Sequence, residues 1–195
     1  MNENNDILSE LFEKYMGYLD LCSFPQEILD VFRGKKMELL SKVSEVKIPR
    51  KFLEFVPIIP FKIINLRDQI KKVRGSSGSL IEENLFDIAE NLPDEPYFIY
   101  GVEIGMYTKG TPPQIAELLI ERVKRSPLTL AEGMGVIFYY PEILRNCYLD
   151  CIGTRYEKRN KIPHILLREG KIRLGLGGEK LFSSQWGSPS CFGRV

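Results

Sequence analysis

The chain has 195 residues, of which 44% are hydrophobic and 27% are charged, and its formal net charge is +1. This composition is that of a globular protein with a substantial core, which excludes an intrinsically disordered chain. Nucleic-acid-binding proteins usually carry a stronger basic excess, and no apolar run reaches the ~18 residues of a membrane helix. We therefore expect neither a nucleic-acid partner nor a membrane partner.

The N-terminal sequence, MNENNDILSE, is acidic and lacks the basic-then-apolar order of a secretory signal. We therefore expect a cytoplasmic location, in which thiols stay reduced. The cysteines concerned are Cys22, Cys147, Cys151 and Cys191.

The N-terminal region predicts a pair of helices. Apolar residues recur at helical spacing over residues 6–20, after Asn5 or Asp6 as an N-cap. Pro25 suits the first position of a second helix that runs to about residue 44, weakened in its middle by Gly34. We expect an antiparallel hairpin that packs on the rest of the chain and also offers a surface for a homodimer.

The next segments alternate between extended and helical patterns. FLEFVPII (residues 52–59) predicts a strand, and its prolines restrict it to an edge or a strand end. Helical spacing predicts one helix over 63–73 and another over 80–92. Between them, the segment GSSGS (75–79) is expected to be a mobile surface loop.

The middle of the chain predicts a central strand and two helices. YFIYGVEIGM (97–106) is rich in aromatic and β-branched residues, as central strands are. A helix begins near residue 111 and is broken by Pro127. Thr129 and Glu132 have the spacing of a capping box and begin a further helix to about residue 140. Gly133 and Gly135 in that helix indicate the close approach of a neighbouring backbone.

Three strands are predicted next, over residues 147–154, 162–168 and 171–176, with Glu169-Gly170 as a tight hairpin turn. The order of elements predicts the α+β class, with a mixed, mainly antiparallel sheet from the C-terminal half packed with helices. We expect a single domain of residues 1–195, in which residues 1–50 are a helical appendage and residues 51–195 the α+β core.

The C-terminal tail, LFSSQWGSPSCFGR (181–194), holds the only tryptophan of the chain, Trp186. A solvated tail would be polar, whereas burial of aromatic rings stabilises a docked one. We expect the tail to fold back across the sheet, anchored by Trp186 and Phe192, and to rim a ligand pocket together with Arg155. The candidate ligand-binding residues are Arg155, Trp186, Ser188, Ser190 and Arg194.

Cys191 and His164, the only histidine, form the candidate catalytic pair. A nucleophilic cysteine needs a nearby base or positive charge, and Arg194 or Arg155 would supply that charge. The tail glycines would let backbone donors approach a developing oxyanion. The alternative is a structural tail whose small residues allow tight packing against the sheet.

Other patterns predict no metal and no cofactor. Cys147 and Cys151 lie four residues apart, which on a strand is ~13 Å, whereas two sulfurs on one zinc ion lie about 4 Å apart. A phosphate-binding loop needs its lysine after the glycines, but here Lys71 and Lys72 come before them. The charged segment RYEKRNK (155–161) is expected to be an exposed hairpin tip.

The C-terminal half resembles a bacterial, largely actinobacterial, family of domains of unknown function that ends in W-G-S-x-S-C-x-x-R. The matching stretches are FVPIIP (55–60), RSPLTLAEGMGV (125–136), PE (141–142), LDCIGTRYEKRNKIPHILL (149–167) and IRLGLGGEKLFSSQWGSPSCFGRV (172–195). The chain departs from the family at Leu176-Gly177-Gly178, where an aromatic-rich segment with a tryptophan is the family pattern. The resemblance implies a shared fold without an assigned activity.

The sequence therefore predicts a cytoplasmic module that binds a small ligand or a protein. The alternative function is that of a small enzyme with Cys191 as its nucleophile.

Overall fold

The computed structural model describes residues 3–73, 84–157, 161–180 and 183–195. In these ranges the helices are α1 (Glu3–Leu21), α2 (Gln26–Gly34), α3 (Lys36–Glu45), α4 (Leu66–Lys72), α5 (Pro113–Arg122) and α6 (Leu130–Tyr139), with a 3-10 helix over Pro141–Arg145. The strands are β1 (Leu53–Ile58), β2 (Leu85–Asp87), β3 (Tyr97–Val102), β4 (Ser126–Pro127), β5 (Tyr148–Asp150), β6 (Thr154–Tyr156), β7 (Lys161–Arg168), β8 (Lys171–Gly178), β9 (Trp186–Gly187), β10 (Ser190–Cys191) and β11 (Gly193–Arg194).

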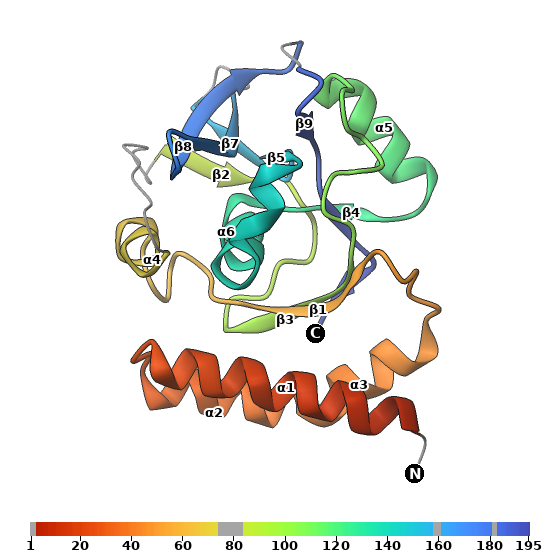
Figure 1. Cartoon of the computed structure of the whole chain (residues 1–195), viewed down its shortest axis with the longest axis vertical. Coiled ribbons are helices and arrows are strands. Elements are labelled where there is room, and N and C mark those ends of the chain that lie inside the picture. Colours follow the sequence, from red (N-terminus) through yellow and green to blue (C-terminus); the bar gives the residue numbers. More distant parts are fainter. Residues whose placement is uncertain (1–2, 74–83, 158–160, 181–182) are drawn as a thin grey trace.

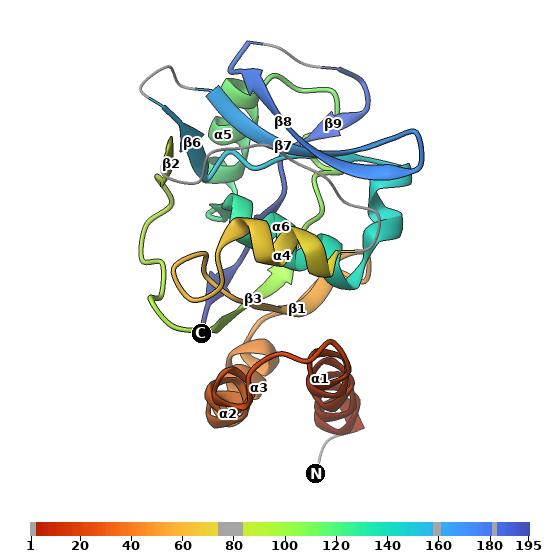
Figure 2. The same cartoon turned by 90° about the vertical axis from the view of Figure 1, so that its left-hand side faces the viewer.

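These elements stack in layers (Figures 1 and 2). The N-terminal helices lie beneath a sheet of order β1-β3-β11, which we name sheet A. Helix α6 lies above sheet A, followed by a second sheet of order β2-β6-β7-β5-β9 with β8 paired to β7, which we name sheet B. Helix α5 lies beside sheet B. The pairings are antiparallel except for β5 with β9, so the predicted α+β class and the mixed, mainly antiparallel character are confirmed.

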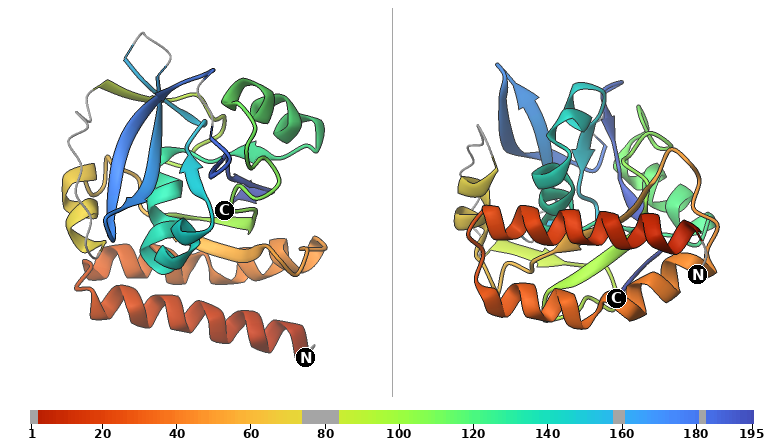
Figure 3. Two further views of the ribbon diagram at one scale, coloured as in Figure 1. Left: turned by 45° about the horizontal axis from the view of Figure 1, so that its top comes forward. Right: turned by 60° about the horizontal axis from the view of Figure 1, so that its bottom comes forward.

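The N-terminal helices cover the outer face of sheet A. Helix α1 runs antiparallel to α2 and α3, as Figure 3 shows, and its buried side chains Phe12 and Tyr15 contact Phe98 and Phe55. The second predicted helix is two helices, because the chain bends at Lys35 beyond Gly34. The apolar side of these helices is therefore used within the chain.

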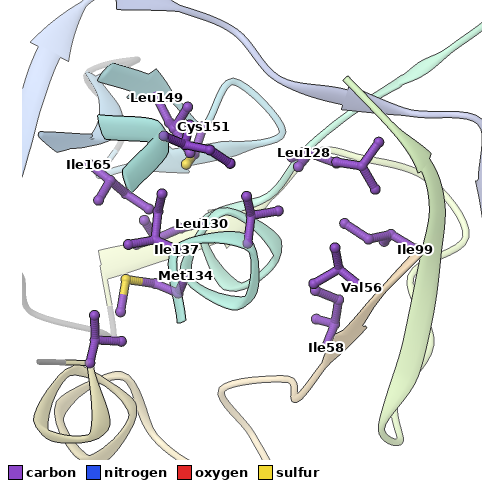
Figure 4. Packing of buried hydrophobic residues seen from close by; sticks show 14 of the residues in the cluster. Val56, Ile58, Ile99, Leu128, Leu130, Met134, Ile137, Leu149, Cys151 and Ile165 are labelled. Carbon is purple, nitrogen blue, oxygen red and sulfur yellow. The ribbon is translucent and has the colours of Figure 1, made fainter. Parts of the chain in front are cut away.

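Helix α6 is the centre of the larger hydrophobic core (Figure 4). The Thr129 and Glu132 capping box is confirmed, since each side chain accepts from the other residue's backbone N–H. The two glycines mark close approach, but of side chains at Gly133, whereas at Gly135 the Pro57 backbone is near as well as a side chain. A Cβ at Gly133 would lie 2.6 Å from Cys151 Sγ, and one at Gly135 would lie 2.5 Å from the Ile58 side chain. Both sheets therefore pack directly on this helix.

Sheet A agrees with the two strands predicted for it. β1 is an edge strand with Pro57 opposite Phe98, and β3 is central. β3 ends at Val102, earlier than predicted, just after Gly101 takes a φ of +59°. The ring of Phe192 occupies the space that a side chain at position 101 would need, so a glycine is required there.

Sheet B corrects one predicted strand and confirms a turn. The strand expected over 147–154 is split into β5 and β6 by a turn at Cys151–Gly153, because Gly153 lies against the backbone of Leu128. Glu169 and Gly170 take φ of +54° and +73° between β7 and β8, which is the conformation of the predicted tight turn.

The helix expected over residues 80–92 is wrong for its described part. β2 pairs there with β6, and Pro93 follows soon after, so tertiary pairing overrides local helical spacing. Residues 80–83 of that helix and the loop 75–79 lie outside the described residues. So do residues 158–160 of the charged tip and the first two residues of the tail.

The tail joins the two sheets rather than crossing one. β9 pairs in parallel with β5 in sheet B, β10 pairs with β4, and β11 pairs with β3 in sheet A. The tail is therefore docked from Trp186 to Val195, whereas Ser184 and Gln185 before it are exposed. No helix in the described ranges has the length and apolar character needed to cross a membrane.

Candidate functional site

One face of sheet B packs on α6 through Leu149, Cys151 and Ile165. Side chains alternate along a strand, so the neighbouring residues Asp150 and His164 point to the opposite face. They are direct partners across β5 and β7. Because Cys151 N–H donates to Pro163 O, the adjacent Asp150–His164 pair is a non-hydrogen-bonded one, in which opposing side chains lie closest.

Trp186 reaches the same face from the tail. It is the register partner of Tyr148, two residues before Asp150. Its ring centroid lies 4.7 Å from that of His164, although β5 separates their two strands. A Cβ at Gly177 in β8 would lie 3.5 Å from Trp186 Cζ3, so the indole reaches across both β5 and β7, and this face of the sheet is concave. Gly175, opposite His164, leaves room for the imidazole, since a Cβ there would collide with Nε2.

Ser188 completes this group. The parallel register of β5 and β9, extended by one residue, sets Ser188 beside Asp150. The Ser188 backbone is held by Thr108, whose hydroxyl accepts from Ser188 N–H at 2.7 Å and lies 2.9 Å from Ser188 O. We name the four residues Asp150, His164, Trp186 and Ser188 the concave cluster.

Polar atoms of the concave cluster are buried without protein partners. Asp150 is 2% exposed, His164 6% and Ser188 0%. Asp150 Oδ2, His164 Nδ1 and Ser188 Oγ have no hydrogen-bond partner among the described residues. Leaving a buried polar group unpaired costs about 1–3 kcal/mol, so three such atoms on one face are a marked departure from ordinary core packing.

Burial moves the two titratable groups in opposite directions. It raises the pKa of Asp150 to about 7 and lowers the pKa of His164 to about 4. At neutral pH the imidazole is therefore uncharged, and the carboxyl is divided between its two forms. Perturbed pairs of this kind are concentrated at functional sites.

The far end of the tail has the opposite character, because its polar groups are paired. Arg194 forms an ion pair with the fully buried Glu132, Nε to Oε1 at 2.6 Å, and also donates to Ser126 Oγ. Tyr97 donates to Glu132 as well. The Glu132 carboxylate raises the pKa of Arg194 above its ordinary value, outweighing burial. These contacts hold this end of the tail to α6, β3 and β4.

Ser190 also helps to hold the tail in place. Its hydroxyl and carbonyl accept from Arg125, whose guanidinium contacts the rings of both Phe52 and Phe192, at 4.7 and 4.3 Å from their centroids. The tail also lines a cavity of about 690 Å³ through Phe192, Gly193 and Arg194.

Arg155 does not line that cavity. Its side chain is buried in β6, between β2 and β7, where it donates to Ile152 O and approaches the carboxylates of Glu117 and Glu179 at 3.4 and 3.8 Å. The predicted association of Arg155 with the tail is replaced by these contacts.

Cys191 and His164 are not brought together. Cys191 lies in β10, paired with Ser126, whereas His164 lies in sheet B. Burial raises the pKa of Cys191 to about 12, and the low pKa of His164 leaves the imidazole neutral. A thiolate–imidazolium pair requires the reverse of both shifts. The geometry therefore opposes Cys191 as a nucleophile.

The sequence reasoning missed Asp150. The signal was present in YLDC, where a lone carboxylate alternates with apolar residues in a predicted strand and so must face away from the core. Nothing in the sequence placed it opposite His164. Within the described residues, no three histidine, cysteine, aspartate or glutamate side chains are arranged to hold a metal ion.

Comparison with protein families gave a match over residues 82–180, which include Asp150 and His164, to a family described as "Family of unknown function (DUF5701)". Comparisons with curated proteins and with solved structures gave no match. The matched region covers half of the 195 residues and includes α5, α6 and most of sheet B. The chain therefore belongs to the DUF5701 family, whose function is unknown.

Proposed function

We propose that this protein is a binding module that holds a small polar ligand against the concave cluster. The observation that carries this proposal is the set of three unpaired polar atoms, Asp150 Oδ2, His164 Nδ1 and Ser188 Oγ. A ligand that hydrogen-bonds all three would recover a desolvation cost that folding alone leaves in place. Trp186 is the most exposed member of the cluster, so access from solvent is expected on its side.

Two features support a rigid, prepared site. The Ser188 backbone is fixed by Thr108, and the Trp186 carbonyl accepts from Gly110 N–H at 2.7 Å. A site whose walls are already in place loses less entropy when it binds. The free thiols of Cys147, Cys151 and Cys191 support a reducing compartment, and we propose the cytoplasm.

Trp186 makes the proposal directly testable, because it is the only indole in the chain. A library of small polar metabolites should contain a compound that changes the Trp186 emission and raises the melting temperature by mass action. Ser188→Ala, which removes one of the unpaired atoms, should weaken that binding about 10-fold, equivalent to ~1.4 kcal/mol.

Lys124→Ala is the matched control, because Lys124 is exposed and lines the tail cavity instead. This variant should bind like the unmodified protein. If no compound moves the Trp186 emission, or if Ser188→Ala and Lys124→Ala weaken binding equally, the concave cluster is not the binding site.

A further inference from the structure

We infer that the concave cluster recognises a primary ammonium group, with Asp150, His164 and Ser188 each accepting one of its three N–H bonds. This inference rests on the proposed function and names the chemical class of the ligand.

The unpaired atoms match this group in number and in kind. Asp150 Oδ2 accepts when the carboxyl is ionised, and Ser188 Oγ has lone pairs free to accept. A neutral imidazole accepts through one nitrogen. His164 Nδ1 is buried and has no hydrogen-bond partner among the described residues. It is an acceptor in the tautomer that carries the proton on Nε2. A primary ammonium is a compact centre with three donors and no acceptor.

Charge favours the same ligand. Asp150 is a buried carboxyl whose Oδ2 has no hydrogen-bond partner among the described residues, and burial raises its pKa. A cation beside it would favour ionisation, whereas an anion would oppose it. The indole of Trp186 adds a ring face, and aromatic faces attract ammonium groups.

The groups around Asp150 leave it as the site's main titrating residue. His164 faces it from β7, and Cys147 and Cys151 flank it on its own segment. Burial holds the pKa of both thiols above the ordinary value. The segments packed nearby contribute Glu103 and Lys109, which act on Cys147 with opposite signs.

Binding of an ammonium ion should therefore release the proton of Asp150. Below the Asp150 pKa of about 7, affinity should fall about 10-fold for each unit of pH, because the carboxyl must first ionise. Above that pKa, affinity should level off. A neutral ligand that uses the same atoms would show no such loss at low pH.

The experiment uses three probes at matched ionic strength: methylammonium, tetramethylammonium and acetamide. Tetramethylammonium has the charge without N–H donors, and acetamide has N–H donors without the charge. Trp186 emission is titrated with each probe from pH 5.5 to 8.5 in the full-length protein. We expect methylammonium to bind at least about 10-fold tighter than either control, and Asp150→Asn to abolish this preference. A thermal melt establishes that Asp150→Asn is folded.

The possible results distinguish failure of the ammonium assignment from failure of the binding site itself. If acetamide binds as well as methylammonium, or if Asp150→Asn retains methylammonium binding, the ammonium assignment is overturned while the site stands. Equal binding of tetramethylammonium and methylammonium also overturns it, because the three acceptors would then be unused. If Trp186 responds to none of these probes but does respond to a metabolite without an ammonium group, the assignment again fails alone. A response to nothing refutes both the assignment and the site.

Discussion

At the scale of single residues, Asp150 and His164 should balance each other in the pH dependence of stability. The folded state raises the pKa of Asp150 from 3.8 to about 7, so Asp150 stabilises the fold less as pH rises through that range. Burial in the folded state lowers the pKa of His164 from 6.5 to about 4, so His164 stabilises the fold less as pH falls through that range. Between pH 4 and 6.5 the folded pair and the unfolded pair each hold one proton, and the two effects cancel.

Single substitutions should expose each half of this balance. In Asp150→Asn only the histidine effect remains, so the free energy of unfolding should fall, relative to the unmodified protein, by about 1.4 kcal/mol per pH unit as pH drops from 6.5 to 4. His164→Gln should show a relative change of the opposite sign. Urea denaturation at three pH values in this range measures both slopes. Parallel curves for all three proteins would contradict the assignment of these protons.

The ion pair of Arg194 with Glu132 gives a second prediction at this scale. Glu132→Gln leaves a buried guanidinium without its counter-charge, which costs about 3–5 kcal/mol. Glu13→Gln is the control, because Glu13 pairs with Lys36 at the exposed surface, where such pairs contribute ~0–1 kcal/mol. Urea denaturation compares the two variants. A Glu132→Gln protein as stable as Glu13→Gln would show that the ion pair does not hold the tail.

At the scale of elements, two helical glycines should respond oppositely to alanine. Gly133→Ala sets a methyl group 2.6 Å from Cys151 Sγ and 3.1 Å from Ile165, so α6 must shift at a cost of about 1–3 kcal/mol. Gly17→Ala in α1 meets nothing within 4 Å and should stabilise the protein by ~0.5–1 kcal/mol. Thermal melts of the pair measure both effects. If Gly133→Ala stabilises as well, α6 is not in direct contact with sheet B.

Elements were predictable where local chemistry decides the conformation. The capping box at Thr129, the edge strand with Pro57 and the turn at Gly170 each follow from residues close together in the chain. The helix expected over 80–92 failed because pairing of β2 with β6 is a long-range contact with no local signal. The same reason applies to Asp150, whose partner His164 is chosen by register.

Among the site residues too, those marked by local sequence were predictable and those placed by long-range contacts were not. Trp186 and Ser188 were found because the tail is unusual in composition. The interpretation of Cys191 as a nucleophile depends on the arginines and glycines near it in the sequence, whereas its burial in β10 is decided by the fold. Arg155 was grouped with the tail by charge, whereas it is held by Glu117 and Glu179.

At the scale of the whole molecule, the tail should be required for cooperative folding. Removing residues 190–195 deletes β10 and β11 and leaves the buried Glu132 without Arg194. We expect this truncated chain to lose more stability than Glu132→Gln and to be cleaved rapidly by a protease under native conditions. Limited proteolysis of both proteins tests this. A truncated chain as resistant to the protease as the full-length protein would mean that the two sheets hold together without the end of the tail.

The proline in β1 has a consequence for association between molecules. Phe98 exchanges both of its backbone hydrogen bonds with Val195, so the backbone of its partner Pro57 faces the outer edge of sheet A, where Gly135 of α6 lies against the Pro57 carbonyl. Proline carries no N–H, and that edge consequently offers no donor at its centre to a strand from a second molecule. Together with the cover that α6 provides at Pro57, the missing donor protects this edge from intermolecular strand addition, the first step towards aggregation of β-sheet proteins.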